Sequence, residues 1–153
     1  MSGSGEKIEC KYFKQAISNE NFLLSIERSF SKDFFDWKTT VAFYSALHYI
    51  KSYALTKGVV LSDHSDTFKK LYSQQGKSPT LKIDSKIVSC YRNLFRLAHS
   101  SRYDGYTKPD VCGKIGKLRF KDAKEYLELV KHWIVPKLEK ANINTKMESI
   151  QEN

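Results

Sequence analysis

The sequence has little of what interrupts or crosslinks the chain of a small protein. Its 153 residues include only 7 Gly and 3 Pro, which excludes a collagen-like repeat and argues against a disordered, Gly/Pro-rich chain. Cysteine is scarce as well, because Cys10, Cys90 and Cys112 are the only three and lie far apart. An odd number at wide spacing predicts neither a complete disulfide framework nor a paired-cysteine zinc site. We therefore expect reduced thiols.

A long hydrophobic run is also missing. The longest apolar stretch, residues 41–55, is interrupted by Ser45, His48 and Lys51, whereas a membrane helix needs about 18 uninterrupted apolar residues. No basic and apolar leader opens the chain, and we interpret the small polar run at residues 1–5 as a linker. We expect a cytoplasmic protein without a membrane partner.

The sequence does contain enough material for one core. Hydrophobic residues make up 41% of the chain, and nine Tyr and nine Phe are among them. A chain of this length buries roughly 70% of the surface that its unfolded form exposes. We expect a single domain over residues 6–140, without internal repeats, and a frayed polar tail over residues 141–153.

The first third of the chain predicts two helices. Residues 6–57 contain neither Gly nor Pro, which argues against turn-rich strands. Ser31, Asp33 and Asp36 offer N-cap side chains, so we divide the interval there. The second helix carries a core-facing stripe at steps of four, three and four, formed by Phe43, Leu47, Ile50 and Ala54.

The middle of the chain predicts two more helices. A short one covers residues 63–75 and is capped by Ser62 or Asp63. A longer one covers residues 81–101 and has the most regular apolar stripe of the chain, formed by Ile83, Ile87, Tyr91, Leu94 and Ala98.

An irregular segment and a last helix follow. Residues 103–117 contain Gly105, Pro109, Gly113 and Gly116, which predicts a loop. The last helix is expected over residues 119–135, where Pro136 ends or kinks it. The predicted fold class is an all-α bundle of four to five helices, with an irregular basic loop before the last helix.

The charge is positive and unevenly distributed. The formal net charge is +9, and residues 92–124 alone carry nine cations and three anions. A concentrated positive charge favours a polyanionic partner through field attraction and counterion release. The alternative is a solvated, lysine-rich face that keeps the protein soluble.

Most catalytic patterns are absent from the sequence. The run GKIGK at residues 113–117 lacks the spacing of a phosphate-binding loop, and no Ser lies in a nucleophile elbow. His48, His64, His99 and His132 are scattered rather than paired at helical metal spacing. We therefore expect no metal and no cofactor.

One stripe on the helix predicted over residues 81–101 could carry chemistry. Arg92 and His99 are seven residues apart, so they differ by only about 20° around a helix axis and by roughly 10 Å along it. Arg96 lies about 40° from Arg92 on the same face. Guanidinium groups bind phosphate and an imidazole exchanges protons near neutral pH, so the stripe could hold RNA and cleave it. The alternative is a surface face paired with carboxylates or water.

These residues resemble the HEPN family (higher eukaryotes and prokaryotes nucleotide-binding domain). Its ribonuclease members carry Arg, a polar residue and then His, with four to six residues between Arg and His, and Arg92, Asn93 and His99 match that pattern with six. A second match is DWKTTVAFYSALHYIKSYAL at residues 36–55, and a third is SSRYDGY at residues 100–106. Together they cover most of residues 36–106.

The resemblance implies an activity and partners. Arg92 would contact the scissile phosphate, His99 would transfer protons, and Asn93 would orient Arg92 or a phosphate oxygen. The protein would be a homodimer with a composite site, a metal-independent endoribonuclease of single-stranded or looped RNA, in the role of a toxin or defence effector. A nucleotidyltransferase antitoxin would be a further partner, although Ser101 stands where modified members have Tyr.

Other readings stay open at this point. A non-catalytic HEPN-like module would bind RNA, nucleotide or a nucleotidyltransferase partner, and a helical scaffold would use its Tyr and Phe surface for protein contacts. Further RNA contacts are expected from cationic and aromatic residues that follow the stripe, although the two tyrosines could instead pack at the edge of the core. These residues are Arg102, Tyr103, Tyr106, Lys108, Lys114, Lys117 and Arg119.

Overall fold

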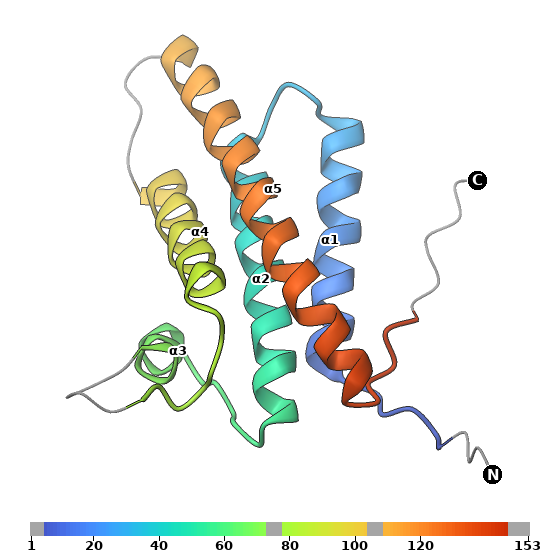
Figure 1. The fold of residues 1–153 in the computed structure, drawn as a ribbon. Coiled ribbons are helices and arrows are strands. Elements are labelled where there is room, and N and C mark those ends of the chain that lie inside the picture. The colour runs from blue at the N-terminus through green and yellow to red at the C-terminus, as the bar shows by residue number, and fades with distance from the viewer. Residues whose placement is uncertain (1–4, 73–77, 104–108, 147–153) are drawn as a thin grey trace.

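The computed structural model describes residues 5–72, 78–103 and 109–146, although the side chains of 102, 103 and 109–113 are not described. Five helices form within these ranges (Figure 1). They are α1 (Lys11–Ser29), α2 (Phe35–Thr56), α3 (His64–Leu71), α4 (Ser85–Tyr103) and α5 (Pro109–Lys140). The predicted all-α bundle is confirmed.

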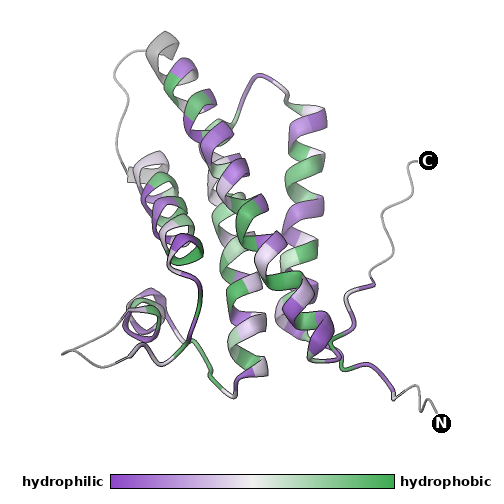
Figure 2. Cartoon of the chain, viewed as in Figure 1, coloured by the Kyte–Doolittle hydropathy of each residue, from purple (hydrophilic) through white to green (hydrophobic). Residues whose placement is uncertain are grey.

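The second helix is the centre of the bundle. α2 packs against α1, α4 and α5, and α4 also packs against α5 (Figure 1). The short α3 joins the bundle through Phe68, whose ring lies 5.4 Å from the Tyr91 ring and 5.1 Å from the Phe95 ring, between centroids. Hydrophobic and hydrophilic segments alternate along α1, α4 and α5 (Figure 2), as expected for helices that bury one face.

The apolar stripes predicted for α2 and α4 form the core. Phe43 and Ala54 of α2 and Tyr91, Leu94 and Ala98 of α4 have no exposed surface. Burying a large apolar side chain stabilises the folded state by roughly 1.5–3 kcal/mol, so these stripes determine which face of each helix turns inward. Cys10 and Cys90 are free thiols buried in the same core, as expected, whereas Cys112 lies outside the described side chains.

The helix starts follow the predictions only in part. The division between α1 and α2 falls where it was predicted, but Phe34 is the N-cap residue of α2, with a positive φ of 59° and no capping side chain. The expectation that Ser31, Asp33 or Asp36 caps this helix was therefore wrong. Asp36 lies in the first turn instead, where its negative charge interacts favourably with the helix dipole.

α3 begins as predicted and ends early. The carboxylate of Asp63 accepts a hydrogen bond from the backbone N–H of Asp66 at 2.7 Å, which is the expected N-cap interaction. Asp66 in turn accepts from the backbone N–H of Ser62 at 2.9 Å, and that bond together with Lys70 lowers the pKa of Asp66 to about 2. The helix stops at Leu71 rather than at residue 75.

The irregular basic loop expected before the last helix is a helix from Pro109 onward. Proline is favoured at the first helical position, where its missing N–H has no partner to lose. Gly116 also lies within this helix and not in a turn. A Cβ at this position would lie 3.2 Å from Cβ of Phe35, so the glycine allows α5 to pack closely on α2. Pro136 does not end the helix, which continues to Lys140. Residues 104–108 of the expected loop lie outside the described ranges.

The two ends of the described chain lie side by side. The backbone N–H of Ile8 donates to the carbonyl of Asn142, and the N–H of Asn144 donates to the carbonyl of Ile8, both at 2.8 Å. Ile143 is buried, with 6% of its surface exposed. These contacts hold residues 142–144 of the tail against the N-terminal segment, and residues 147–153 lie outside the described ranges.

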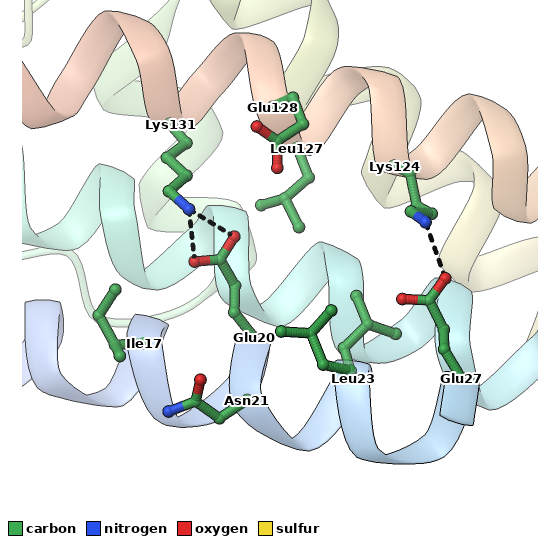
Figure 3. A pocket seen from close by; sticks show the side chains of 10 residues that line it. Ile17, Glu20, Asn21, Leu23, Glu27, Lys124, Leu127, Glu128 and Lys131 are labelled. Carbon is green, nitrogen blue, oxygen red and sulfur yellow. Dashed lines mark hydrogen bonds and ion pairs between the residues drawn. The ribbon is translucent and has the colours of Figure 1, made fainter. Parts of the chain in front are cut away.

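Two ion pairs tie α1 to α5 across a pocket (Figure 3). Lys124 contacts Glu27 at 2.7 Å, and Lys131 contacts Glu20 at 3.2 Å. Glu20 also accepts a hydrogen bond from the hydroxyl of Tyr49 at 2.5 Å, and burial near this carboxylate raises the pKa of Tyr49. No helix within the described ranges is long and apolar enough to cross a membrane.

Candidate functional site

The predicted polar stripe lies on α4. Arg92, Arg96 and His99 all fall within this helix, so the helical geometry places them on one face, beside the buried Tyr91 and Ala98. Arg96 and His99 are exposed, whereas Arg92 is half-buried. The face therefore offers one guanidinium and one imidazole to solvent, and holds a second guanidinium at the edge of the core.

Arg92 is held by an aromatic ring from the end of α3. Its guanidinium carbon lies 5.8 Å from the centroid of the Tyr72 ring, within the distance at which a cation is attracted to an aromatic face. The Nε atom of Arg92 is buried and has no hydrogen-bond partner within the described part of the chain. Among the described residues, the ring of Tyr72 is therefore a contact that favours this placement of the guanidinium.

His99 lies at the edge of an aromatic cluster. Its ring is 6.2 Å from the ring of Phe95, and Phe95 is 5.3 Å from His64 and 5.8 Å from Phe43, all between centroids. These rings come from α2, α3 and α4. His64 is the first residue of α3, and it is half-buried against the rings of Phe43 and Phe95.

Two buried tyrosine hydroxyls lie below this face. The hydroxyls of Tyr72 and Tyr91 are buried without a hydrogen-bond partner within the described residues. Burial raises the pKa of Tyr91, and the nearby Tyr72 and Tyr44 raise it further. Tyr91 therefore stays protonated near neutral pH and serves as a packing residue of the cluster.

Asn93 is on α4 but not on the same face. It lies one residue after Arg92, so the two side chains leave the helix about 100° apart. Asn93 is half-buried. Within one chain the geometry brings Arg92, Arg96 and His99 together, and sets Asn93 to one side of them.

The cationic residues of α5 form a separate stripe. Lys114, Lys117 and Lys121 are exposed at helical steps of three and four, and the stripe continues to Lys124, which pairs with Glu27 of α1. It therefore runs on the side of α5 that turns toward α1. Arg119 is half-buried and lies outside this stripe.

The other expected RNA-binding residues are not placed. Tyr103 ends α4 and Arg102 precedes it, but their side chains are not described. Tyr106 and Lys108 lie outside the described ranges. Among the side chains that the structure does describe, no three His, Cys, Asp or Glu gather as a metal site would require.

Residues that no local sequence pattern predicts support the stripe. Tyr72, His64 and Phe95 contact Arg92 and His99 or lie one ring away from them. Helical periodicity compares positions within one helix, and Tyr72 and Arg92 belong to different parts of the chain. Only the aromatic spacing of Phe68 and Tyr72 hinted at a packed face on α3.

Comparison with known proteins identifies a family. The model of the HEPN domain family matches residues 13–140. This range includes α2, α3 and α4 completely and extends to the last residue of α5. No curated protein and no solved structure matches the chain.

Proposed function

The chain belongs to the HEPN domain family, whose members are ribonuclease-type or nucleotide-binding modules, and from this membership we propose that it is a metal-independent endoribonuclease. The substrate is single-stranded or looped RNA. The observation that carries the proposal is that Arg92, Arg96 and His99 share one face of α4, with His99 exposed. A guanidinium and an imidazole on the same side of one helix support the proposal, because these groups bind phosphate and transfer protons.

The reaction uses the nucleophile that RNA itself supplies. The ribose 2′-oxygen attacks the adjacent phosphorus, its proton passes to a base, and the bond from phosphorus to the 5′-oxygen breaks as that oxygen takes up a proton. An imidazole such as His99 can serve in either proton transfer. A guanidinium that is fixed in place, as Arg92 is by Tyr72, stabilises the negative charge that develops on the phosphate oxygens.

A dimer would complete the site. A single chain contributes one His99 and one Arg92, whereas general acid and general base catalysis need two proton-transfer groups. A second copy that faces α4 would supply the second imidazole and a second pair of guanidiniums. The exposure of His99 and Arg96 supports such an arrangement, since a second copy can approach exposed side chains. A toxin or defence role, held in check by a nucleotidyltransferase antitoxin, is part of the same proposal.

The test is cleavage of a labelled single-stranded RNA in excess chelator. We expect cleavage to continue, and to stop when the nucleotide before the cut carries a 2′-deoxyribose. Loss of activity in chelator, or cleavage without the 2′-hydroxyl, would contradict the mechanism. His99→Ala should abolish cleavage with little change in RNA affinity. His132→Ala is the matched control, because His132 is an exposed histidine of α5.

One observation favours a second candidate, a non-catalytic module that binds RNA or nucleotide. Arg92 is half-buried and its Nε is covered, so only part of its guanidinium is open to a phosphate. The two candidates differ in the His99→Ala experiment. If the protein is a binding module, the wild type already shows no cleavage, so His99→Ala has no activity to remove. Its RNA affinity still falls steeply as the salt concentration rises.

A further inference from the structure

A pocket of about 300 Å³ lies between α1 and α2 and includes none of Arg92, Arg96 and His99. Six side chains line it: Gln15, Asn19 and Phe22 from α1, and Val41, Tyr44 and His48 from α2. Its walls therefore combine two carboxamides, two aromatic rings, one aliphatic side chain and one imidazole. This mixture differs from the apolar core, and we call it the α1–α2 pocket.

The polar wall of the α1–α2 pocket consists of two carboxamides that are hydrogen-bonded to each other. The amide nitrogen of Gln15 donates to the amide oxygen of Asn19 at 2.9 Å. This bond orients both carboxamides and leaves the oxygen of Gln15 and the nitrogen of Asn19 for another partner. A donor and an acceptor side by side match the edge of a nucleobase, as carboxamides do when they read bases.

The imidazole of His48 adds an acceptor. Its Nδ1 lies 2.7 Å from the carbonyl oxygen of Tyr44, and since a carbonyl only accepts, Nδ1 carries the proton. The other ring nitrogen, Nε2, is then the acceptor of the neutral ring. Burial lowers the pKa of His48, and the nearby Lys51 lowers it further, so the ring is neutral at physiological pH.

The aromatic wall is open to solvent. Phe22 has 57% of its surface exposed although it is one of the large apolar residues of the chain. An exposed ring at the mouth of a pocket is suited to stacking, and every base offers a face to stack on. Tyr44 provides a second ring on the opposite helix.

Positive charge lies beside the pocket. The ring of Tyr12 is 6.4 Å from the ring of His48, and the ammonium groups of Lys11 and Lys51 lie 5.0 Å and 5.7 Å from the centroid of the Tyr12 ring. Two ammonium groups at this edge are complementary to the phosphates on either side of a bound nucleotide. An apolar peptide would offer no negative charge to pair with these two ammonium groups.

The α1–α2 pocket is connected to the α4 face by a continuous set of side chains. Tyr44 also lines a second pocket, between α2 and α3, together with His64. The ring of His64 contacts Phe95, and Phe95 contacts His99. Since packed helices lie roughly 8–10 Å apart, the α1–α2 pocket is about two such steps from α4, and a single strand of a few nucleotides can span that distance.

We propose that the α1–α2 pocket binds one unpaired base of an RNA strand whose cleaved phosphate lies at His99. The inference rests on the proposed ribonuclease function, because that function implies an RNA strand bound at His99. Phe22 and Tyr44 hold the base by stacking, Gln15, Asn19 and His48 contact its edge, and Lys11 and Lys51 neutralise neighbouring phosphates. The pocket then acts as a specificity subsite, several nucleotides away from the cut.

The experiment measures binding and cleavage separately. The His99→Ala protein is titrated with a 12-nucleotide single-stranded RNA, with and without the additional substitutions Phe22→Ala and Gln15→Ala. We expect Phe22→Ala to weaken binding at least about fivefold, the lower end of what one stacked base contributes. Phe30→Ala is the matched control, because Phe30 is another exposed aromatic residue, at the end of α1, with 48% of its surface exposed, and it does not line the pocket.

A crosslinking experiment locates the base directly. RNA that carries a single photoreactive uridine is scanned along the strand in the His99→Ala protein, and we expect crosslinks at Phe22 or Tyr44 from one position only. Equal affinity of the Phe22→Ala and Phe30→Ala proteins, or crosslinks only outside residues 15–22 and 41–48, would overturn the subsite. If wild-type protein fails to cleave RNA while Phe22→Ala still weakens binding, the subsite stands and the ribonuclease proposal falls. If cleavage occurs and Phe22→Ala has no effect on binding, the ribonuclease proposal stands and the subsite falls.

Discussion

The guanidinium carbon of Arg92 on α4 lies 5.8 Å from the centroid of the Tyr72 ring, the residue that follows α3. A short helix with few contacts of its own thus orients the cation that we assign to the phosphate. Phe68 of α3 lies parallel to Tyr72, with ring centroids 5.9 Å apart, and it also packs on Tyr91. The position of Arg92 therefore depends on how firmly α3 is attached to α4.

Replacing the Tyr72 ring tests this dependence. Tyr72→Leu removes the cation–π contact, which contributes about 0.5–1 kcal/mol at a partly exposed site, so we expect kcat/KM for RNA cleavage to fall roughly two- to fivefold. The loss should lie in kcat, since the guanidinium still carries its charge but is no longer fixed. Steady-state kinetics on a short RNA would measure it.

Tyr72→Phe is the control for this substitution. Phenylalanine keeps the ring and removes a hydroxyl that is buried without a partner in the described part of the structure. We expect cleavage to stay near the wild-type rate and stability to be equal or slightly higher. Equal losses for Leu and Phe would show that the ring does not position Arg92.

The N-cap of α3 offers a second test. Asp63→Ala removes the acceptor for the backbone N–H of Asp66, and N-cap substitutions of this kind lower stability by about 0.5–2 kcal/mol. Asp63→Asn retains an acceptor oxygen and should cost much less. Urea unfolding gives the free energies of unfolding, and hydrogen exchange of the α3 amides shows whether the loss is local. Similar values for Ala and Asn would mean that the cap contributes nothing.

Local sequence patterns were enough for the bundle and for the stripe on α4. The spacing of Tyr91, Leu94 and Ala98 determines which face of α4 is buried, and the same helical geometry then places Arg92 and His99 on a shared face. These features depend on residues within one helix. For that reason they follow from the sequence without knowledge of the neighbouring helices.

The features that sequence patterns missed depend on contacts between distant segments. Gly116 and Pro109 normally indicate a turn, yet here the first is a point of close approach to Phe35 and the second opens α5. The contact of Tyr72 with Arg92 and that of His64 with Phe95 join separate helices. No spacing within the sequence encodes such pairs, because they are selected by the packing of the whole bundle.

Burial of His48 predicts a dependence of stability on pH. The pKa of His48 is lowered in the folded protein, chiefly by burial, so below about pH 6.5 the unfolded chain binds a proton more readily than the folded chain does. The free energy of unfolding should therefore rise with pH from the lowered pKa up to about 6.5 and then level off. Urea unfolding between pH 5 and 8, at constant ionic strength, would show this slope.

His48→Asn tests the assignment of that slope. The carboxamide can still donate to the carbonyl of Tyr44 but does not titrate, so the rise between the lowered pKa and about pH 6.5 should become shallower. His132→Asn is the matched control, since the Nδ1 of His132 contacts the carbonyl oxygen of Glu128 four residues earlier, also at 2.7 Å, but at an exposed position. If the slope persists in His48→Asn and disappears in His132→Asn, then His132 and not His48 causes the pH dependence.

The close approach at Gly116 predicts opposite effects for small and large side chains. Ala is a better helix former than Gly by about 1 kcal/mol, but a Cβ at this position would lie 3.2 Å from Cβ of Phe35, an atom fixed to the α2 backbone. The two effects should nearly cancel in Gly116→Ala, whereas Gly116→Leu should lower the free energy of unfolding by about 1–3 kcal/mol through overpacking. Gly113→Ala provides a second helical glycine for comparison. If Gly116→Leu is as stable as the wild type, α5 does not pack on α2 at this distance, and the first turns of α5 would have to lie farther from Phe35.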